Sequence, residues 1–279
     1  MPAAQPISQC GSVTALSLGL PSSAAIPAAK GTLPKQMFTA KTPVSAKLKQ
    51  RFANDIDSIT MLALLRPSTI GVAANPDGKG VGEIMVLGIR HRGTSAPIEV
   101  IEHIAAMRRS GIIFVCVRDG VTADATDTAQ QQAQPSHNDS SSRKSLAAEQ
   151  AAQATPVAQG ESCAFAVRRA LPGRPGHPQL SKVFAGDYRP AGEARLIISG
   201  ETLDDVWNSL NAQIILGSSN AENIDARIAT RDRFAALRAD ETKLAKDHAR
   251  AKQPAQRNEI YAKLHKVRVE LSHLAVEQQ

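Results

Sequence analysis

An unbroken apolar run at residues 112–117, followed by Arg118, restricts the fold of this chain more than any other feature. The run is rich in β-branched residues and far too short to cross a membrane, so it predicts a strand that is buried on both faces. A strand of this kind lies inside a sheet whose two faces are both covered. The chain therefore needs a layered architecture, with other elements packed on each side of a sheet.

Further elements are predicted before this run. Apolar residues at helical spacing predict helices over residues 45–63 and 97–109. Strands are expected at 69–74 and at 82–90, and the second of these is apolar on both faces. The intervening residues 75–80 have the sequence Asn-Pro-Asp-Gly-Lys-Gly, a strong turn signal, so we expect a hairpin.

The pattern continues after the apolar run. Strands are predicted at 162–169 and 193–199. Thr202 and Asp205 have the spacing of a capping box, and Gly217 is suited to end the helix that the box begins. Together these elements predict the α+β class: a mixed sheet of about five strands with flanking helices, followed by a C-terminal helical hairpin or short coiled coil.

Composition divides the chain into parts. Residues 1–43 are rich in Ala, Pro, Ser and Thr and predict a flexible N-terminal arm. Residues 44–217 form the expected α/β head. Within it, residues 121–160 are polar and poor in apolar side chains, so we expect a disordered insertion. Residues 221–279 contain no glycine and form the expected helical hairpin.

The second helix of the hairpin, after Pro254, carries an apolar seam at alternating spacings of four and three. Such a seam must pack against a partner, which is the other helix, a second copy of the chain or another protein. We take its residues as candidates for partner binding. They are Ile260, Leu264, Val267, Leu271 and Leu274.

The formal net charge of +7 favours a polyanionic partner such as DNA, because cationic side chains release counterions from phosphates. The positive excess lies mainly in the first 120 residues, although a solvated flank before a helix would show the same pattern. Only 3% of the residues are aromatic, which argues against a single-strand binder built on base stacking. The candidate phosphate contacts are Lys47, Lys49, Arg51, Arg90 and Arg92.

Several classes of protein are disfavoured by what the sequence lacks. Cys10, Cys116 and Cys163 are far apart, which excludes a disulfide scaffold and suits a reducing compartment. The motifs of phosphate-binding loops, dinucleotide-binding folds, zinc proteases and serine hydrolases are absent. No apolar run of about 18 residues predicts a membrane span. Residues 11–29 lack the basic start of a signal peptide. We expect a cytoplasmic protein without a cofactor, a bound metal or a membrane contact.

Asp77 and Glu83 raise a catalytic alternative. Two carboxylates after a helix and a turn, with a lysine nearby, are the groups of a metal-dependent nuclease. The lysine normally lies two residues after the second acid, where this chain has Met85, and Lys79 lies in the turn instead. Glu83 would equally serve as a surface carboxylate that pairs with an arginine.

Short segments along most of the chain outside the insertion suggest a family. They are Leu20-Pro21, Leu33-Pro34-Lys35 with Phe38, Lys47-Leu48-Lys49 with Phe52 and Ile56, Pro67-Ser68-Thr69-Ile70, Glu83-Ile84, Ile112-Ile113-Phe114, Lys252-Gln253, and Arg257-Asn258-Glu259-Ile260 with Leu264. Their order resembles the bacterial family known as domain of unknown function 4391. The chain departs from that pattern at residues 61–63, where the family tends to have a tryptophan, and in its long insertion.

The resemblance implies no activity, but family members often look like neighbours of helicases and DNA methyltransferases in restriction or phage-defence loci. We therefore expect a non-catalytic accessory component of a DNA-processing, restriction or phage-defence assembly. Its partner would be a protein such as a helicase or methyltransferase, with DNA as a further ligand. The alternatives are a divergent metal-dependent nuclease and a structural homo-oligomer held by the coiled coil.

Overall fold

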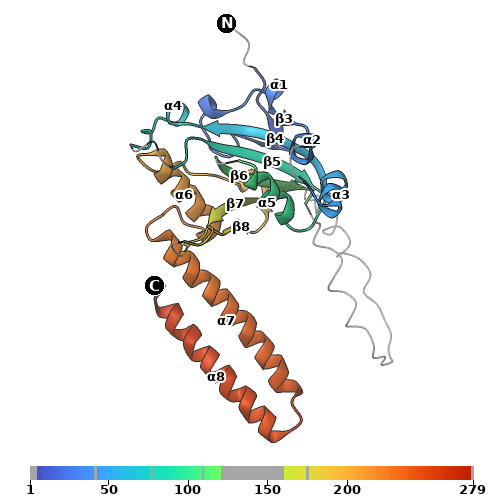
Figure 1. Ribbon diagram of the computed structural model, residues 1–279, viewed down its shortest axis with the longest axis vertical. Coiled ribbons are helices and arrows are strands. Elements are labelled where there is room, and N and C mark those ends of the chain that lie inside the picture. The colour runs from blue at the N-terminus through green and yellow to red at the C-terminus, as the bar shows by residue number, and fades with distance from the viewer. Residues whose placement is uncertain are drawn as a thin grey trace, which may run out of the picture.

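The computed structural model describes residues 5–40, 43–76, 78, 80–108, 110–120, 160–173 and 176–277. Most of these residues form a head around one mixed sheet, and a helical hairpin projects from the head (Figure 1). Among the described residues, no helix is both long enough and apolar enough to cross a bilayer.

Within the described residues, the main sheet has seven strands rather than about five, and the predicted α+β class with a mixed sheet is confirmed. Six strands lie in the order β3-β4-β5-β6-β7-β8, and β9 pairs with β7. Only β5 and β6 are parallel, and the other neighbours are antiparallel. The strands are β3 Thr32–Leu33, β4 Ile56–Leu65, β5 Ile84–His91, β6 Gly111–Arg118, β7 Ser162–Ala170, β8 Ser181–Ala185 and β9 Arg189–Pro190.

The parallel pair forms the centre of the head. A parallel pair needs a crossover connection, and α5 (Ile98–Ala106) supplies it between β5 and β6. The predicted helix at 97–109 and the predicted strands at 82–90 and 112–118 are thus confirmed. Every described residue of β6 is buried except the half-buried Arg118, as expected for a central strand.

The two faces of the sheet are covered by different elements. On one face, Met85, Leu87 and Ile89 of β5 pack with α5 and with Phe52 of α3 (Ala46–Asn54). On the other face, Ile84 and Val86 pack with the N-terminal segment and with α6 (Leu203–Leu216). Two separate cores therefore hold the sheet between layers, which explains why its central strands are apolar on both sides.

The N-terminal segment is part of the head, which corrects the prediction of a flexible arm over residues 1–43. Cys10, Val13, Leu18 and Leu20 are each at most 3% exposed. They cover the face of the sheet that α6 leaves open, so their burial depends on residues far away in the sequence. The segment contains β1 Gln9–Cys10, β2 Val13–Thr14, η1 Ser22–Ala24, α1 Ala28–Gly31, β3 and α2 Gln36–Thr39.

Gly88 allows this close packing. A Cβ atom at Gly88 would collide with the side chain of Cys10, which lies directly above the strand. Glycine at this position of β5 therefore lets the N-terminal segment approach the sheet.

The predicted helix over residues 45–63 is correct only in its first half. Helix α3 spans Ala46–Asn54, and the chain then enters β4. Two register irregularities interrupt the pairing of β4 with β5, between Ile56 and Ser58 and between Met61 and Ala63. Bulges of this kind break the alternation of a strand, so buried residues recur at a spacing of about three, as they would in a helix.

Two predicted strands are absent. Residues 67–70 form the short helix α4 (Pro67–Ile70) in place of a strand at 69–74, and β4 rather than that segment forms the hairpin with β5. At 193–199, η2 (Ala191–Glu193) leads into an extended segment without a neighbouring strand. In place of a neighbouring strand, the side chain of Gln213 forms hydrogen bonds with the backbone N–H and carbonyl of Ile197.

The predicted ends of α6 are confirmed. The Thr202 hydroxyl accepts a hydrogen bond from the Asp205 N–H, and the Asp205 carboxylate accepts one from the Thr202 N–H. Gly217 ends the helix with a φ of 71°, in the left-handed region that glycine adopts without strain. Of the predicted insertion at 121–160, only Gly160 belongs to the described residues.

The predicted C-terminal hairpin is also confirmed. It consists of α7 (Ile224–Arg250) and α8 (Pro254–Glu277), with Pro254 as the first residue of α8. Ile224 and Ile228, in the first turns of α7, are buried against the head. The rest of the pair extends away from the sheet as an arm (Figure 1). At 1.5 Å per residue, α7 is about 40 Å long.

Candidate functional site

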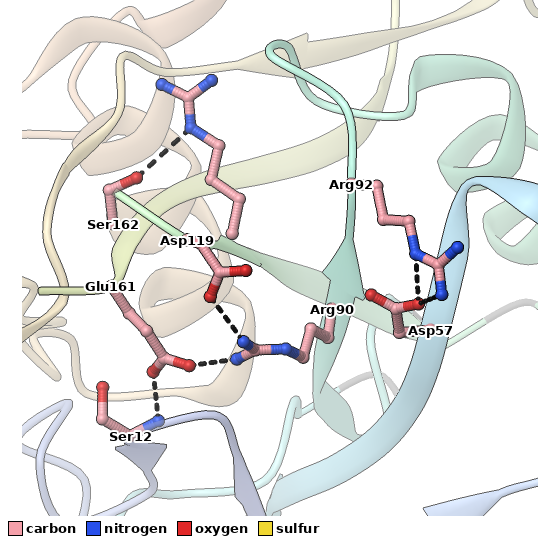
Figure 2. Close-up of polar contacts among 8 residues, drawn as sticks. Ser12, Asp57, Arg90, Arg92, Asp119, Glu161 and Ser162 are labelled. Atoms are coloured by element: carbon pink, nitrogen blue, oxygen red, sulfur yellow. Dashed lines mark hydrogen bonds and ion pairs between the residues drawn. The ribbon is translucent and has the colours of Figure 1, made fainter. Parts of the chain in front are cut away.

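The carboxyl ends of β5 and β6 meet at one edge of the sheet, where α/β proteins commonly bind ligands. Arg90, His91 and Arg92 lie at the end of β5, while Arg118 ends β6 and Asp119 follows it. The fold thus brings two of the predicted phosphate contacts, Arg90 and Arg92, into one polar cluster (Figure 2).

Arg90 lies at the centre of this cluster, between two carboxylates. Its guanidinium donates to Asp119 at 2.6 Å and also to Glu161. Glu161 accepts a further hydrogen bond, of 2.5 Å, from the backbone N–H of Ser12 (Figure 2). Burial opposes ionisation of Glu161, but the hydrogen bonds from Ser12 and Arg90 outweigh it and hold the pKa of this carboxyl below its ordinary value.

The network around Arg90 joins parts of the chain that are distant in sequence. Asp119 precedes residues 121–159 and Glu161 follows them, and a Cβ atom at Gly120 would collide with the carbonyl oxygen of Gly160. Arg90 therefore ties the two ends of this segment to β5 and, through Glu161, to the N-terminal segment. Two carboxylates of the protein balance the charge of Arg90. The structure therefore favours a structural role for this residue over the predicted phosphate contact.

The other predicted phosphate contacts lie on the surface. Arg92 donates to Asp57 at 2.8 Å, and Lys47 and Arg51 of α3 both pair with Glu99 of α5. Such exposed ion pairs are weak and exchange readily. Lys49 is exposed and forms no ion pair with any residue that the structure describes. Binding of DNA by these side chains stays a prediction.

A buried polar pair lies at the same edge. His91 is only 3% exposed, and its Nε2 lies 2.6 Å from the hydroxyl of Tyr188. The N–H of Gly93 donates to Nδ1, so a neutral ring carries its proton on Nε2 and donates to Tyr188. Burial and the charge of Arg118, which stacks on the Tyr188 ring at 3.9 Å, lower the pKa of His91. Burial likewise raises the pKa of Tyr188, so both side chains stay neutral near pH 7.

The predicted nuclease carboxylates are only partly described. Glu83 accepts two hydrogen bonds from Arg66, at 2.8 and 3.1 Å, as a surface carboxylate paired with an arginine would. Asp77 and Lys79 lie outside the described residues. Across the ranges that the structure describes, no three His, Cys, Asp or Glu side chains gather closely enough to hold a metal ion.

The three cysteines are buried thiols. Cys116 is fully buried in β6, and burial raises its pKa. Burial also raises the pKa of Cys10 to about 12 and that of Cys163 to about 11. A thiol reacts as its thiolate, so none of these groups is activated as a nucleophile.

The predicted seam of α8 packs against α7 of the same chain. Leu264 and Leu271 are 4% and 6% exposed, and the other three seam residues are half-buried. Ion pairs connect the two helices, as between Arg268 and Glu241 at 2.9 Å. Of the three partners considered for the seam, the structure shows the other helix of the hairpin.

A second stripe runs along α8, from the border of the seam to the opposite side of the helix, and the sequence analysis missed it. At about 100° per residue, its members lie between about 60° and 180° around the helix from Leu264. Tyr261 is nearest to the seam, and its ring centre lies 6.0 Å from that of His248 on α7. Every member is exposed, with Tyr261 at 56% and Val269 at 42%, and none is Asp, Glu, Lys or Arg. We call this set the outer stripe: Pro254, Ala255, Asn258, Tyr261, Ala262, His265, Val269, Ser272 and His273. A helical projection of the sequence would have revealed it.

Comparison with known proteins identifies the family. No curated protein and no solved structure matches the chain. The family model described as Domain of unknown function (DUF4391) matches residues 18–271, from the buried Leu18 to the seam residue Leu271. This match includes the head and most of the hairpin, so the chain belongs to the DUF4391 family.

Proposed function

We propose that this protein is an accessory component of a bacterial DNA-processing, restriction or phage-defence assembly, and that the α7–α8 hairpin docks on a protein partner. The observation that carries the docking role is the outer stripe, a charge-free face exposed along a projecting helix. The kind of assembly rests only on the expectation drawn from the family resemblance in the sequence analysis, that such proteins neighbour helicases and DNA methyltransferases.

The outer stripe differs from an ordinary solvent-facing helix surface. A helix that is apolar on one side normally carries charged residues on the other. In α8 the charged residues instead lie between the seam and the outer stripe, as Arg268 and Lys266 do. A helix with two opposite uncharged faces is suited to packing on both sides, and α7 covers only one of them.

The side chains of the stripe suit recognition of a protein. Tyrosine is enriched among residues that dominate binding energy, because it buries a large ring at low entropic cost. Tyr261 and Val269 are eight residues apart, and would be the anchors of a helix lying in an apolar groove. Arg257 and Lys266 flank the stripe on either side and form no ion pair with a described residue. The partner groove is therefore expected to have an apolar floor and an acidic rim.

The test is affinity capture of tagged full-length protein from the source bacterium, with and without nuclease, read by mass spectrometry. Val269→Glu and Tyr261→Glu place a charge on the stripe. Ala239→Glu adds the same charge at an exposed position of α7 and serves as the matched control. Far-ultraviolet circular dichroism of each variant checks that the hairpin remains helical.

We expect one protein partner to be captured equally with and without nuclease. The Ala239→Glu variant should capture as much of it as the wild type. Either stripe variant should capture at least about tenfold less. Equal capture by all variants would exclude the stripe as the docking face. A partner lost on nuclease treatment would show that DNA bridges the two proteins. A purified chain that sediments as an oligomer, and becomes monomeric with Val269→Glu, would favour self-association instead.

A further inference from the structure

A cavity of about 410 Å³ lies in the head, and none of its lining residues belongs to the polar cluster around Arg90 or to the outer stripe. Phe165 of β7 and Arg189 of β9 line one side. The segment containing Arg195 and Leu196 lines another, and α6 contributes Ile214 near its end. The volume is within the range of small-molecule sites, which are mostly apolar with a few polar groups.

The charged groups of this cavity are both cationic. Arg189 and Arg195 are both exposed, and neither forms an ion pair with a residue that the structure describes. The guanidinium of Arg189 lies 6.0 Å from the centre of the Phe165 ring. Arg195 uses its Nη1 to reach the carbonyl oxygens of Gly192 and Ala194, and its other N–H groups have no partner among the described residues. No Asp or Glu is among the lining residues.

Hydrogen bonds hold the cavity walls in place without a ligand. The Gln213 side chain accepts from the Ile197 N–H at 2.9 Å and donates to the Ile197 carbonyl at 2.7 Å, which fixes the Arg195 segment to α6. The Ser209 hydroxyl donates to the Ser219 carbonyl at 2.9 Å and fixes the turn after α6. A site formed in advance loses little entropy when it binds.

We propose that this cavity binds a phosphomonoester, with the phosphate on Arg189 and Arg195 and the organic body against Phe165, Leu196 and Ile214. Guanidinium groups bind carboxylates and phosphates through paired N–H donors. A phosphomonoester carries close to two negative charges at pH 7, which matches the two arginines, whereas a carboxylate carries one. The ligand is a nucleotide-sized molecule, either free or at the 5′ end of a nucleic-acid strand.

The test measures binding to the full-length protein by calorimetry. The probes are inorganic phosphate, adenosine monophosphate, adenosine, and one oligonucleotide with a 5′-phosphate or a 5′-hydroxyl. Arg189→Gln and Arg195→Gln remove the charges, and Arg189→Lys retains one as a rescue. Arg257→Gln, at an exposed position of α8, is the matched control. Both cavity arginines are exposed, so the variants are expected to fold, and thermal melting verifies this.

We expect adenosine monophosphate or the 5′-phosphorylated oligonucleotide to bind. The matching probe without phosphate, adenosine or the 5′-hydroxyl oligonucleotide, should not bind. Each glutamine variant should weaken binding by about tenfold or more, Arg257→Gln should not change it, and Arg189→Lys should restore part of it. Binding should also weaken below about pH 6, where the phosphate gains a proton. Absence of binding by every phosphate at millimolar concentration, or equal binding by adenosine and its monophosphate, would overturn the proposal. Binding that the glutamine variants leave unchanged would also overturn it.

Discussion

Leu18 and Leu16 provide a direct test of whether the N-terminal segment belongs to the core. Both are leucines of one short segment, but Leu18 is fully buried and Leu16 is 52% exposed. Replacing Leu18 by Ala removes three buried carbons, which at about 0.8 kcal/mol each is about 2.4 kcal/mol of transfer free energy. A cavity that does not collapse adds to this, and measured Leu→Ala losses reach about 2–5 kcal/mol.

The surroundings of Leu18 limit that collapse. Its N–H donates to the Thr14 carbonyl at 3.2 Å, and its own carbonyl accepts from the Leu196 N–H at 2.8 Å. The backbone is thus tied on both sides, and we expect a loss of about 3 kcal/mol in the free energy of unfolding. At roughly 2–4 °C per kcal/mol, the melting temperature should fall by about 6–12 °C.

The assay is thermal and urea denaturation of the full chain, with Leu16→Ala as the matched control. Leu16→Ala should stay within about 0.5 kcal/mol of the wild type, because the side chain is largely exposed. If Leu18→Ala were as mild as Leu16→Ala, the segment would not contribute to the core, and the reasoning would be refuted.

Three further predictions concern the edge of the sheet, the ion pair before β5 and the hairpin. Glu161→Gln is expected to destabilise the head by about 2 kcal/mol at pH 7. The pKa of Glu161 is lowered in the folded state, so its contribution is complete above the ordinary value of 4.5 and is lost as pH falls through the folded value. Melting curves from pH 3 to 7 should therefore show a shallower acid limb in this variant, and an unchanged limb would contradict the assignment. Glu83→Ala removes the ion pair with Arg66 and should lower the free energy of unfolding by less than about 1 kcal/mol. The variant should leave any magnesium-dependent DNA cleavage unchanged. Abolished cleavage would instead establish the nuclease alternative. Leu271→Asp places a charge in the buried seam, so the circular dichroism signal of helix at 222 nm should decrease while the head still melts cooperatively. An unchanged helical signal would show that the seam does not hold the hairpin together.

Sequence reasoning succeeded where burial follows from local pattern. The run at 112–117 is apolar throughout, and both faces of β5 were assigned correctly, because these strands are covered on both sides. It failed at β4, where bulges give a strand the spacing of a helix. It also failed for the N-terminal segment, since nothing near Leu18 in the sequence reveals the sheet face that buries it.

The candidate site shows the same division. The α8 seam was visible as a heptad, whereas its partner became known only from the hairpin. The role of Arg90 depends on Glu161, 71 residues away, and no local pattern connects them. The outer stripe was present in the sequence as a lack of charge, a signal that a search for apolar residues passes over.

The meeting of Gly120 and Gly160 has a consequence for how this family can diverge. Gly120 and Gly160, which flank the 39 residues numbered 121–159, lie close together, and Arg90 secures the chain on both sides of them. The entropy of closing a loop grows only with the logarithm of its length, so doubling such a segment costs only about 0.6 kcal/mol. Evolution is therefore free to lengthen, shorten or exchange this segment, and the same position is a natural place to graft a tag or a whole domain without disturbing the sheet.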